Sequence, residues 1–303
     1  MAGREKLIII LNSISRKKKK FYRKILPGLS EKYSVDVWET QYRDHAIELG
    51  RDALALNPKG ILAAGGDGTM NQVLNGMMLS QSLDSLPPMG IIPLGTGNDF
   101  ARLGNINPTA ASILDKIAQG GKLTDVGRVN CQNEQGKETI RYFINVASLG
   151  MGPDTVRRLF KSNRSLGPTL TYFKAIIQTF FSHKPEPIEI LTDDWVWQGK
   201  LRVLAIANGQ SFASALYVAP DAHPDDGLFS VFLAGEVPLI KFLLFLRVIK
   251  SKKKIKDNKV RYDTCTKLSL KSVQECWIET EGELAGMLPA QIEIISGAIK
   301  FFR

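Results

Sequence analysis

Short apolar runs alternate with longer amphipathic segments in the first part of the chain, up to Gly121. The runs have the length of strands and lie at residues 6–11, 35–39, 60–64 and 89–92. Between them, apolar residues recur at the spacing of one helix face, as in residues 43–56 and 70–78. This alternation of strand and helix predicts a parallel sheet with helices on both faces.

Beyond Gly121 the pattern changes to short runs with partial alternation, separated by turns. These runs lie at residues 125–130, 142–148, 188–191, 196–208, 229–233, 266–270, 275–279 and 291–295. They predict an antiparallel sandwich or barrel-like domain, interrupted by helices at 169–181 and 238–250. We therefore divide the chain into residues 1–124 and 125–290. The periodicity leaves open whether residues 291–303 return to the first domain.

Two glycine-rich turns follow the third and fourth strands of the first domain. The first is Gly65-Gly66-Asp67-Gly68-Thr69, and the second is Gly95-Thr96-Gly97-Asn98-Asp99. Glycine lets the backbone come close to a ligand, and the free amides at a helix start favour an anion. Because the carboxyl ends of parallel strands lie at one edge of a sheet, we expect the two turns to meet there.

Asp67 stands in the first of these turns, where a bare phosphate would repel its carboxylate. We therefore expect a divalent metal or a proton to accompany Asp67. For this turn alone, the alternative is a strand-to-helix junction capped by aspartate or threonine, without a ligand. The second turn favours the ligand-binding interpretation, because it repeats the order of strand, glycine turn and helix start.

Charge and cysteine content narrow the class of protein. The formal net charge of +10 favours anionic partners, such as a nucleotide, a nucleic acid or an anionic bilayer. Nucleic acid is the least expected of these, because the basic residues lack interleaved aromatic side chains. The three cysteines lie far apart, which indicates neither a zinc site nor a disulfide framework. No apolar run reaches the ~18 residues of a spanning helix, so we expect a soluble, cytoplasmic protein.

Several common catalytic motifs are missing from the sequence. It has neither the P-loop pattern GxxxxGK[ST] nor the dinucleotide-binding pattern GxGxxG. The metalloprotease pattern HExxH and the hydrolase pattern GxSxG are also absent, and the three histidines are scattered. This leaves phosphoryl transfer by positioning, a metal and a carboxylate base.

The sequence GGDGT, followed by PLGTGNDFAR, resembles the bacterial diacylglycerol kinases, a family of soluble lipid kinases related to sphingosine and ceramide kinases. NAD kinases and phosphofructokinases share the GGDG turn, but GTGNDFAR indicates the lipid kinases. The resemblance covers nearly the whole chain. It implies an NAD-kinase-like α/β nucleotide-binding domain, followed by a mainly antiparallel β-sandwich domain that binds lipid. It also implies ATP- and Mg²⁺-dependent transfer of the γ-phosphate to a lipid hydroxyl, with ATP in the cleft between the domains.

The resemblance implies which residues contact nucleotide. Thr40 occupies the place of a family threonine at a strand end, and Asn12 matches in a first turn that lacks the family's proline and glycine. The full expected set is Asn12, Thr40, Gly65, Gly66, Asp67, Gly68, Thr69, Gly95, Thr96, Gly97, Asn98 and Asp99.

The second domain carries the expected metal and base. The segment from His223 to Leu228 resembles the family's DDG element, so Asp226 would offer a carboxylate to Mg²⁺ and His223 and Leu228 their backbone carbonyls. A plain turn capped by aspartates is the alternative. Glu281 replaces the aspartate of the family's Asp-Gly-Glu element, and Glu283 matches its glutamate. Either of these two is the expected general base, and Asp67 is the third expected catalytic residue.

Residues 238–249 are too short and too charged to span a bilayer, yet very apolar for a surface helix. Lys250 and the lysines up to Lys256 follow directly. Apolar insertion beside a polybasic patch predicts peripheral docking on an anionic membrane, at the inner membrane surface. A core helix followed by a solvated loop is the alternative. The basic run from Arg16 to Lys20 likewise fits either phosphate attraction or a solvated helix face.

Two rival functions and the oligomeric state stay open. An NAD-kinase-like enzyme would share the GGDG turn. A non-catalytic membrane-binding relative of the kinases would explain the replacement at Glu281 and the altered turn at Asn12. A homodimer is also left open by the sequence.

Overall fold

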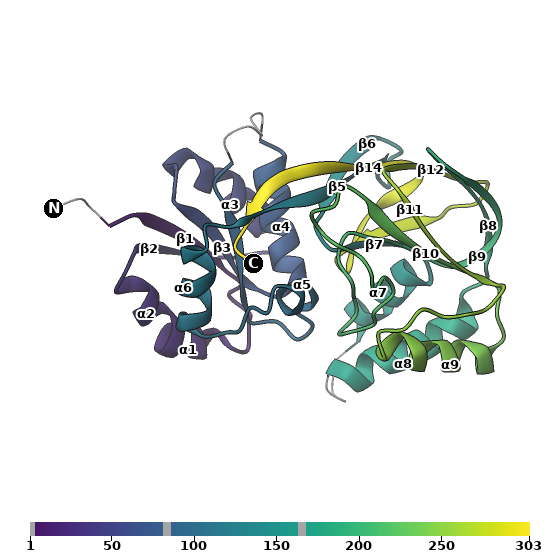
Figure 1. The fold of residues 1–303 in the computed structure, drawn as a ribbon, viewed down its shortest axis with the longest axis horizontal. Coiled ribbons are helices and arrows are strands. Elements are labelled where there is room, and N and C mark those ends of the chain that lie inside the picture. The colour runs from purple at the N-terminus through teal and green to yellow at the C-terminus, as the bar shows by residue number, and fades with distance from the viewer. Residues whose placement is uncertain (1–3, 81–85, 163–167) are drawn as a thin grey trace. The chain divides into compact units, whose positions relative to one another are not determined.

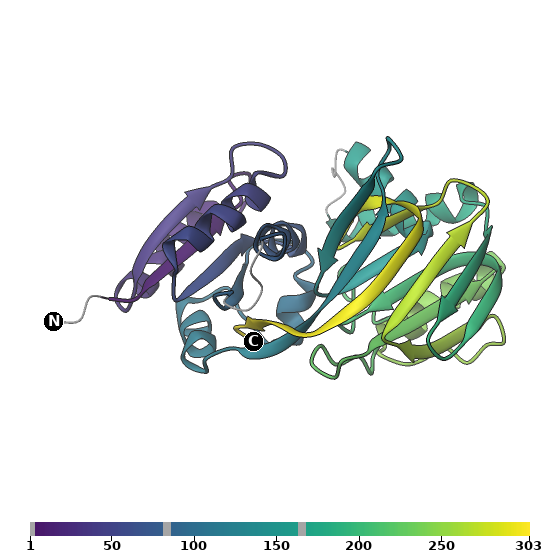
Figure 2. The ribbon, with the colours of Figure 1, turned by 90° about the horizontal axis from the view of Figure 1, so that it is seen from above.

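The computed structural model describes residues 4–80, 86–162 and 168–303. The chain forms two compact units (Figure 1). Unit 1 comprises Met1–Asp125 and Ser296–Arg303, and unit 2 comprises Val126–Ile295. Figure 2 shows the strand β14 (Glu283–Phe301) as one long yellow ribbon, whose first part belongs to unit 2 and whose last residues belong to unit 1.

Unit 1 is built on a parallel sheet with the strand order β14-β4-β3-β1-β2. Besides β14, its strands are β1 (Lys6–Leu11), β2 (Ser34–Glu39), β3 (Gly60–Gly65) and β4 (Met89–Pro93). Every residue of β3 and β4 is buried, as expected of central strands with both faces covered.

The helices of unit 1 connect the parallel strands and cover the sheet. They are α1 (Lys18–Lys20), the π-helical turn Phe21–Ile25, α2 (Leu26–Ser30), α3 (His45–Ala53), α4 (Asp67–Met78), α5 (Asp99–Leu103) and α6 (Ala110–Ala118). Helix α3 packs against α4, and α2 packs against α6. Right-handed crossovers place these two pairs on opposite faces of the sheet.

Unit 2 is mainly antiparallel. Its strands are β5 (Lys122–Gln132), β6 (Glu138–Phe143), β7 (Val146–Gly150), β8 (Glu186–Thr192), β9 (Val196–Ala207), β10 (Phe229–Gly235), β11 (Val260–Cys265), β12 (Lys267–Ser272), β13 (Trp277–Thr280) and the first part of β14. The ladders run from β9 through β7, β13, β14, β12 and β8 back to β9. This closed circuit surrounds the main core of the unit.

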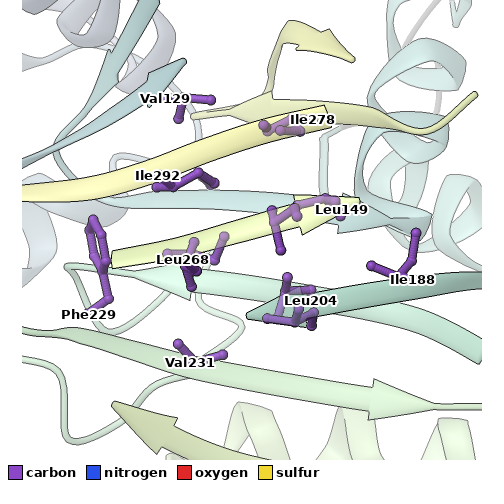
Figure 3. Close-up of a cluster of buried hydrophobic side chains, with 14 of the residues drawn as sticks. Val129, Leu149, Ile188, Leu204, Phe229, Val231, Leu268, Ile278 and Ile292 are labelled. Atoms are coloured by element: carbon purple, nitrogen blue, oxygen red, sulfur yellow. The ribbon is translucent and has the colours of Figure 1, made fainter. Parts of the chain in front are cut away.

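That core takes apolar side chains from all the strands β5 to β14, as Figure 3 shows for residues such as Leu149, Leu204, Leu268 and Ile292. The alternation along β8 illustrates how the sequence produces it, because Ile188 and Ile190 are buried while their neighbours are more exposed. Side chains at every second position of a strand share one face, so a period of two fills the interior.

A second apolar layer covers the outer face of this sheet. It is formed by α7 (Met151–Lys161), α8 (Pro168–Ser182), α9 (Leu239–Lys250) and the loop that follows β9. In Figure 1, α8 and α9 lie next to each other, and the ring centroids of Phe180 and Phe242 are 4.7 Å apart. None of the helices, as far as the structure describes them, has the length and apolar character needed to cross a membrane.

Three features of unit 2 differ from the sequence-based expectations. The helix α7 and the strand β11 were not expected, and the run at 142–148 is two strands separated by a turn at Ile144 and Asn145. Polar residues interrupt the apolar positions of α7, and Pro153 stands in its first turn, where a missing amide hydrogen costs no helical bond. Strand β11 places Arg261 and Asp263 in an edge ladder, so its apolar signal is weak.

Candidate functional site

The ends of four parallel strands gather the expected nucleotide residues at one edge of the unit 1 sheet. Asn12 follows β1 and donates from Nδ2 to Oγ1 of Thr69 (3.1 Å). Thr40 follows β2, and its Oγ1 accepts from the amide of Ser13 (3.2 Å). The two glycine turns follow β3 and β4. The structure therefore brings Asn12, Thr40 and both glycine turns to one edge, and the sequence pattern predicted this meeting for the two turns.

The two glycine turns are in direct backbone contact. The amides of Leu94 and Gly95 both donate to the carbonyl of Gly65, at 2.8 and 3.0 Å. A Cβ atom at Gly95 would run into the Cα atom of Gly66 and lie 2.8 Å from Oδ1 of Asn98. A side chain at Gly95 would therefore force the turns apart.

Helix α4 begins at this contact and presents its first amides to the edge of the sheet. Its N-cap residue is Gly66, which has no side chain to cap the helix, and the first helical bond runs from the amide of Met70 to the carbonyl of Gly66. The amides that precede Met70 are those of Asp67, Gly68 and Thr69. Such amides at a helix start, together with the helix dipole, favour an anion such as phosphate.

Two carboxylates stand beside these amides. Oδ1 of Asp67 accepts from the amide of Phe100 (3.3 Å). Asp99 is buried, and Nη1 of Arg102 donates to it (2.7 Å). Burial, with the negative charge of Asp99 as the second cause, raises the pKa of Asp67 to about 6. Both effects disfavour the charged form of the Asp67 carboxylate. A bound proton or a bound cation would relieve this cost.

The second turn adds an acceptor and a cation. Asn98 has a left-handed backbone (φ 51°), and its Nδ2 donates to the carbonyl of Gly95 (2.9 Å). Its buried Oδ1 has no hydrogen-bond partner among the described residues. Nζ of Lys17 donates to the same carbonyl of Gly95 (3.0 Å). Lys17 belongs to the basic run that follows β1. The composition of this run alone could not show which of its lysines contacts the second glycine turn.

In unit 2, Glu281 and Gly282 form a two-residue turn between β13 and β14. Both have positive φ angles, 53° and 82°, as in a type I′ hairpin. Oε1 of Glu281 accepts from the amides of Ile144 (3.2 Å) and Asn145 (2.6 Å). This carboxylate therefore ties the hairpin to the turn between β6 and β7. Glu283 lies opposite Thr280 in the first ladder position of β14.

Glu279 is a buried acid directly behind this turn, and the sequence interpretation missed it. Its Oε1 accepts from the hydroxyl of Ser148, and its Oε2 accepts from the amide of Gly282 (2.8 Å). Burial raises the pKa of Glu279 to about 7, although these bonds act in the opposite direction. The sequence did contain a signal for this buried acid, because Glu279 directly follows the apolar residues that begin β13. Through these hydrogen bonds, Glu279 stabilises the turn formed by Glu281 and Gly282.

The expected metal residues lie in a turn before β10. Oδ1 of Asp226 accepts from the amide of Leu228 (3.0 Å), and Gly227 has a positive φ of 74°. The side chains of His223, Asp226 and Leu228 are exposed. The described residues contain no cluster of three or more histidine, cysteine or acidic side chains. One exposed carboxylate with backbone carbonyls is an oxygen donor set, which fits a hard cation such as Mg²⁺.

Two family models match the chain. The model of the diacylglycerol kinase catalytic domain matches residues 6–129. The model of the YegS C-terminal NAD kinase beta sandwich-like domain matches residues 146–303. Among curated proteins, the diacylglycerol kinase of Bacillus subtilis (strain 168) is 27% identical over 292 residues, which is 93% of this chain and 91% of that protein.

Solved structures share the fold. A diacylglycerol kinase from Bacillus anthracis str. Sterne has a TM-score of 0.72 at 19% identity, with 100% of this chain and 97% of that chain covered. Yeast NADH kinase, solved in complex with NADH, has a TM-score of 0.53 at 11% identity, with 99% and 83% covered. The predicted fold class is confirmed: an NAD-kinase-like nucleotide-binding domain precedes an antiparallel β-rich domain.

The family models and the curated relatives agree on one class of protein. The resemblance seen in GGDGT and GTGNDFAR is confirmed by the match to residues 6–129, and the second model covers more than half of the chain. The chain therefore belongs to the diacylglycerol kinase family and is a lipid kinase.

Proposed function

We propose that this lipid kinase transfers the γ-phosphate of ATP to the hydroxyl of a diacylglycerol-like lipid, with Mg²⁺ as its metal. The observation that carries the proposal is the contact between the two glycine turns at the start of α4. There, the amides of Asp67, Gly68 and Thr69 precede the first helical bond. Backbone amides at this position can bind a phosphate group, and they make no selection for the base or the sugar of the nucleotide.

Asp226, with the carbonyls of His223 and Leu228, would hold Mg²⁺. The exposed carboxylate and the oxygen-only donor set support this role. When bound, Mg²⁺ would neutralise charge on the transferring phosphate. Asp67 would order the first turn through its bond to the amide of Phe100, and Lys17 would add positive charge beside the second turn.

Phosphoryl transfer also needs a group that accepts the proton of the lipid hydroxyl. We assign this role to the hairpin that carries Glu281 and Glu283. Glu281 is held by the amides of Ile144 and Asn145, so its carboxylate has a fixed position. Glu283 is the first residue of β14 and directly follows Gly282 of the turn. Variants of the two glutamates distinguish the base from its neighbour.

A kinase acting on a bilayer lipid must meet the membrane surface, and two helices of unit 2 suit this contact. Helices α8 and α9 carry six apolar side chains that are 40–75% exposed. They are Leu170, Phe173, Phe181, Ile240, Leu243 and Leu244. Lysines follow α9 directly, from Lys250 to Lys256. Apolar side chains beside a polybasic segment support peripheral binding to anionic bilayers.

A kinase assay with labelled ATP tests the proposal. The wild type is incubated with Mg²⁺ and either dispersed diacylglycerol or NAD, and the labelled product is identified. We expect phosphorylated lipid with diacylglycerol and no labelled dinucleotide with NAD. Because the fold is shared with an NADH kinase, labelled NADP as the main product would overturn the lipid assignment. Omission of Mg²⁺ with added chelator should abolish the lipid product.

A further inference from the structure

Glu279 is a buried acid whose two carboxylate oxygens are both hydrogen-bonded. It lies in the strand β13 and is 2% exposed. Its Oε1 accepts from the hydroxyl of Ser148 on β7, and its Oε2 accepts from the amide of Gly282 (2.8 Å). Burying a carboxyl group is costly unless its oxygens are hydrogen-bonded. We therefore ask what these two bonds hold in place.

The bond to Gly282 reaches the hairpin turn that carries the two candidate bases. Gly282 lies between Glu281 and Glu283, so a change in its backbone moves both carboxylates. Glu281 has a left-handed backbone (φ 53°), which is strained for a residue with a side chain. The amide of Glu281 donates to the carbonyl of Val146 (3.1 Å), and the amide of Gly282 donates to Glu279. The amides of the turn thus have one backbone anchor and one side-chain anchor.

The start of helix α7 packs against the other end of this contact. A Cβ atom at Gly152 would run into Oγ of Ser148 and would lie 3.4 Å from Oε1 of Glu279. Glycine at this position therefore leaves the space that the Ser148 hydroxyl occupies. Because a hydroxyl both donates and accepts, Ser148 can donate to an ionised Glu279 or accept from a protonated one. Oε2 remains an acceptor for the amide of Gly282 in both forms.

Glu279 is not placed to take the proton of the lipid hydroxyl itself, because it is buried and both of its oxygens are engaged. We propose that Glu279 is a positioning residue of phosphoryl transfer: together with Ser148, it holds the amide of Gly282 and so fixes the carboxylates of the hairpin. Glu279 has this role only if the hairpin carries the base, as proposed above. A displacement of a catalytic group by about 1 Å can cost on the order of a hundredfold in rate.

Two substitutions of Glu279 separate position from charge. In Glu279→Leu, an apolar side chain of similar size replaces the acid, and Gly282 loses its acceptor. We expect kcat to fall roughly tenfold or more, while the KM for ATP stays within about twofold because the glycine turns are unchanged. Glu279→Gln should keep kcat within about threefold, since its amide oxygen can accept from Gly282 and its amide nitrogen can donate to Ser148. Initial rates on detergent-dispersed diacylglycerol, over a range of ATP concentrations, measure both.

Gly152→Ala tests the same contact from helix α7. Alanine favours a helix more than glycine does, so the variant should fold, but its methyl group displaces the hydroxyl of Ser148. Its kcat should fall roughly threefold or more, again with the KM for ATP unchanged. Glu189→Leu is the matched control, because Glu189 is an exposed strand glutamate on β8. It should have the kinetics of the wild type.

Hydrogen exchange of the Gly282 amide gives a readout that does not depend on activity. The bond to Glu279 protects this amide in the wild type. In Glu279→Leu, the amide should exchange roughly tenfold faster or more, and in Glu279→Gln at nearly the wild-type rate. Wild-type exchange at Gly282 in Glu279→Leu would overturn the proposal.

The kinetic outcomes distinguish this proposal from the assignment of the base. Wild-type kcat in a folded Glu279→Leu would overturn the positioning role alone, if Glu281→Gln or Glu283→Gln is inactive in the same assay. If both of those variants keep wild-type activity, the base lies elsewhere and both proposals fail. An equal loss of kcat in Glu279→Gln and Glu279→Leu would also overturn the positioning role, because the charge would then be what matters. If Glu279→Leu fails to fold by circular dichroism, wild-type kcat in Gly152→Ala would overturn the proposal.

Discussion

Asp67 is the residue where burial, charge and position at the site coincide. Its carboxylate accepts from the amide of Phe100, and both burial and Asp99 raise its pKa to about 6. We expect Asp67→Asn to reduce lipid phosphorylation on the order of a hundredfold or more, because a transition-state contact is lost. The melting temperature should stay the same or rise, since a charge is removed beside Asp99.

The control for this variant is Asp115→Asn, on the helix α6, far along the chain from both glycine turns. It should keep wild-type activity. Unchanged lipid phosphorylation by Asp67→Asn would contradict the role that we give to the first glycine turn.

Glu281 and Glu283 should differ in their effects. If Glu283 is the base, Glu283→Gln loses about 10²–10⁴-fold in activity, while Glu281→Asp is tolerated or faster. Initial rates of lipid phosphorylation at saturating ATP measure both. An inactive Glu281→Gln with an active Glu283→Gln would reassign the base to Glu281. In that case, the amides of Ile144 and Asn145 orient the catalytic carboxylate itself.

Glu279 predicts a pH dependence of stability. Burial raises its folded-state pKa from 4.5 to about 7, so between these values the folded chain holds a proton that the unfolded chain has lost. Raising the pH through this window therefore favours unfolding, by up to about 3 kcal/mol. Glu279→Gln lacks this titration. The melting temperature of the wild type, relative to Glu279→Gln, should fall by several degrees from pH 5 to pH 8.

The exposed Glu134→Gln serves as the control for Glu279, and its melting temperature should follow the wild type at both pH values. A constant difference between the wild type and Glu279→Gln across this range would show that Glu279 does not carry the raised pKa.

At the scale of elements, the loop after β9 is strained. Phe212 and Leu216 pair as an isolated bridge, and the three residues between them, Ala213, Ser214 and Ala215, all have positive φ angles of 58–74°. A left-handed conformation costs a non-glycine residue about 1–2 kcal/mol. Ala213→Gly and Ala215→Gly should each stabilise the protein by roughly 0.5–1 kcal/mol, because glycine's larger entropy loss offsets part of the relief.

Thermal unfolding of the double variant should show a rise of a few degrees. Ala111→Gly, on the exposed face of α6, is the matched control and should lower the melting temperature, because a helix interior disfavours glycine. A lower melting temperature for the double variant would show that the loop is not strained.

The elements that sequence predicted well are those with a strong apolar period. Strands β1, β3 and β4 are nearly all buried, and the glycine turns had to follow two of them, so the nucleotide edge was predictable from local pattern. The helix α7 and the edge strand β11 were missed because polar residues interrupt their apolar positions. The contacts of Glu279 with Ser148, and of Lys17 with Gly95, join residues far apart in sequence, and no local pattern reports them.

At the scale of the whole molecule, the net charge of +10 suits the membrane contact that we propose. Lys252, Lys253 and Lys254 follow α9, but two of them are already engaged. Nζ of Lys252 lies 4.5 Å from the ring centre of Tyr217, and Nζ of Lys254 pairs with Asp221 (2.6 Å). Because each lysine near an anionic surface contributes about 1 kcal/mol, replacing all three should weaken binding roughly ten- to hundredfold.

Vesicle sedimentation measures this effect for the variant with Lys252, Lys253 and Lys254 all changed to Gln. Phosphatidylserine-rich vesicles at low salt should bind the variant more weakly than the wild type, and raised salt should reduce the difference. Activity on a short-chain lipid in detergent should survive. Equal binding of the wild type and the triple variant at low salt would contradict a role of this segment in membrane docking. It would then favour the alternative, in which α9 is a core helix followed by a solvated loop.

The identity of the phosphoryl acceptor decides whether this chain acts as a diacylglycerol kinase. The most direct measurement is the product formed from γ-labelled ATP when diacylglycerol and NAD are offered together to the purified protein with Mg²⁺. We expect labelled phosphatidic acid, its loss with Asp67→Asn, and no labelled NADP. Labelled NADP without labelled lipid, or no transfer to any lipid in a panel of diacylglycerols and sphingoid bases, would contradict it.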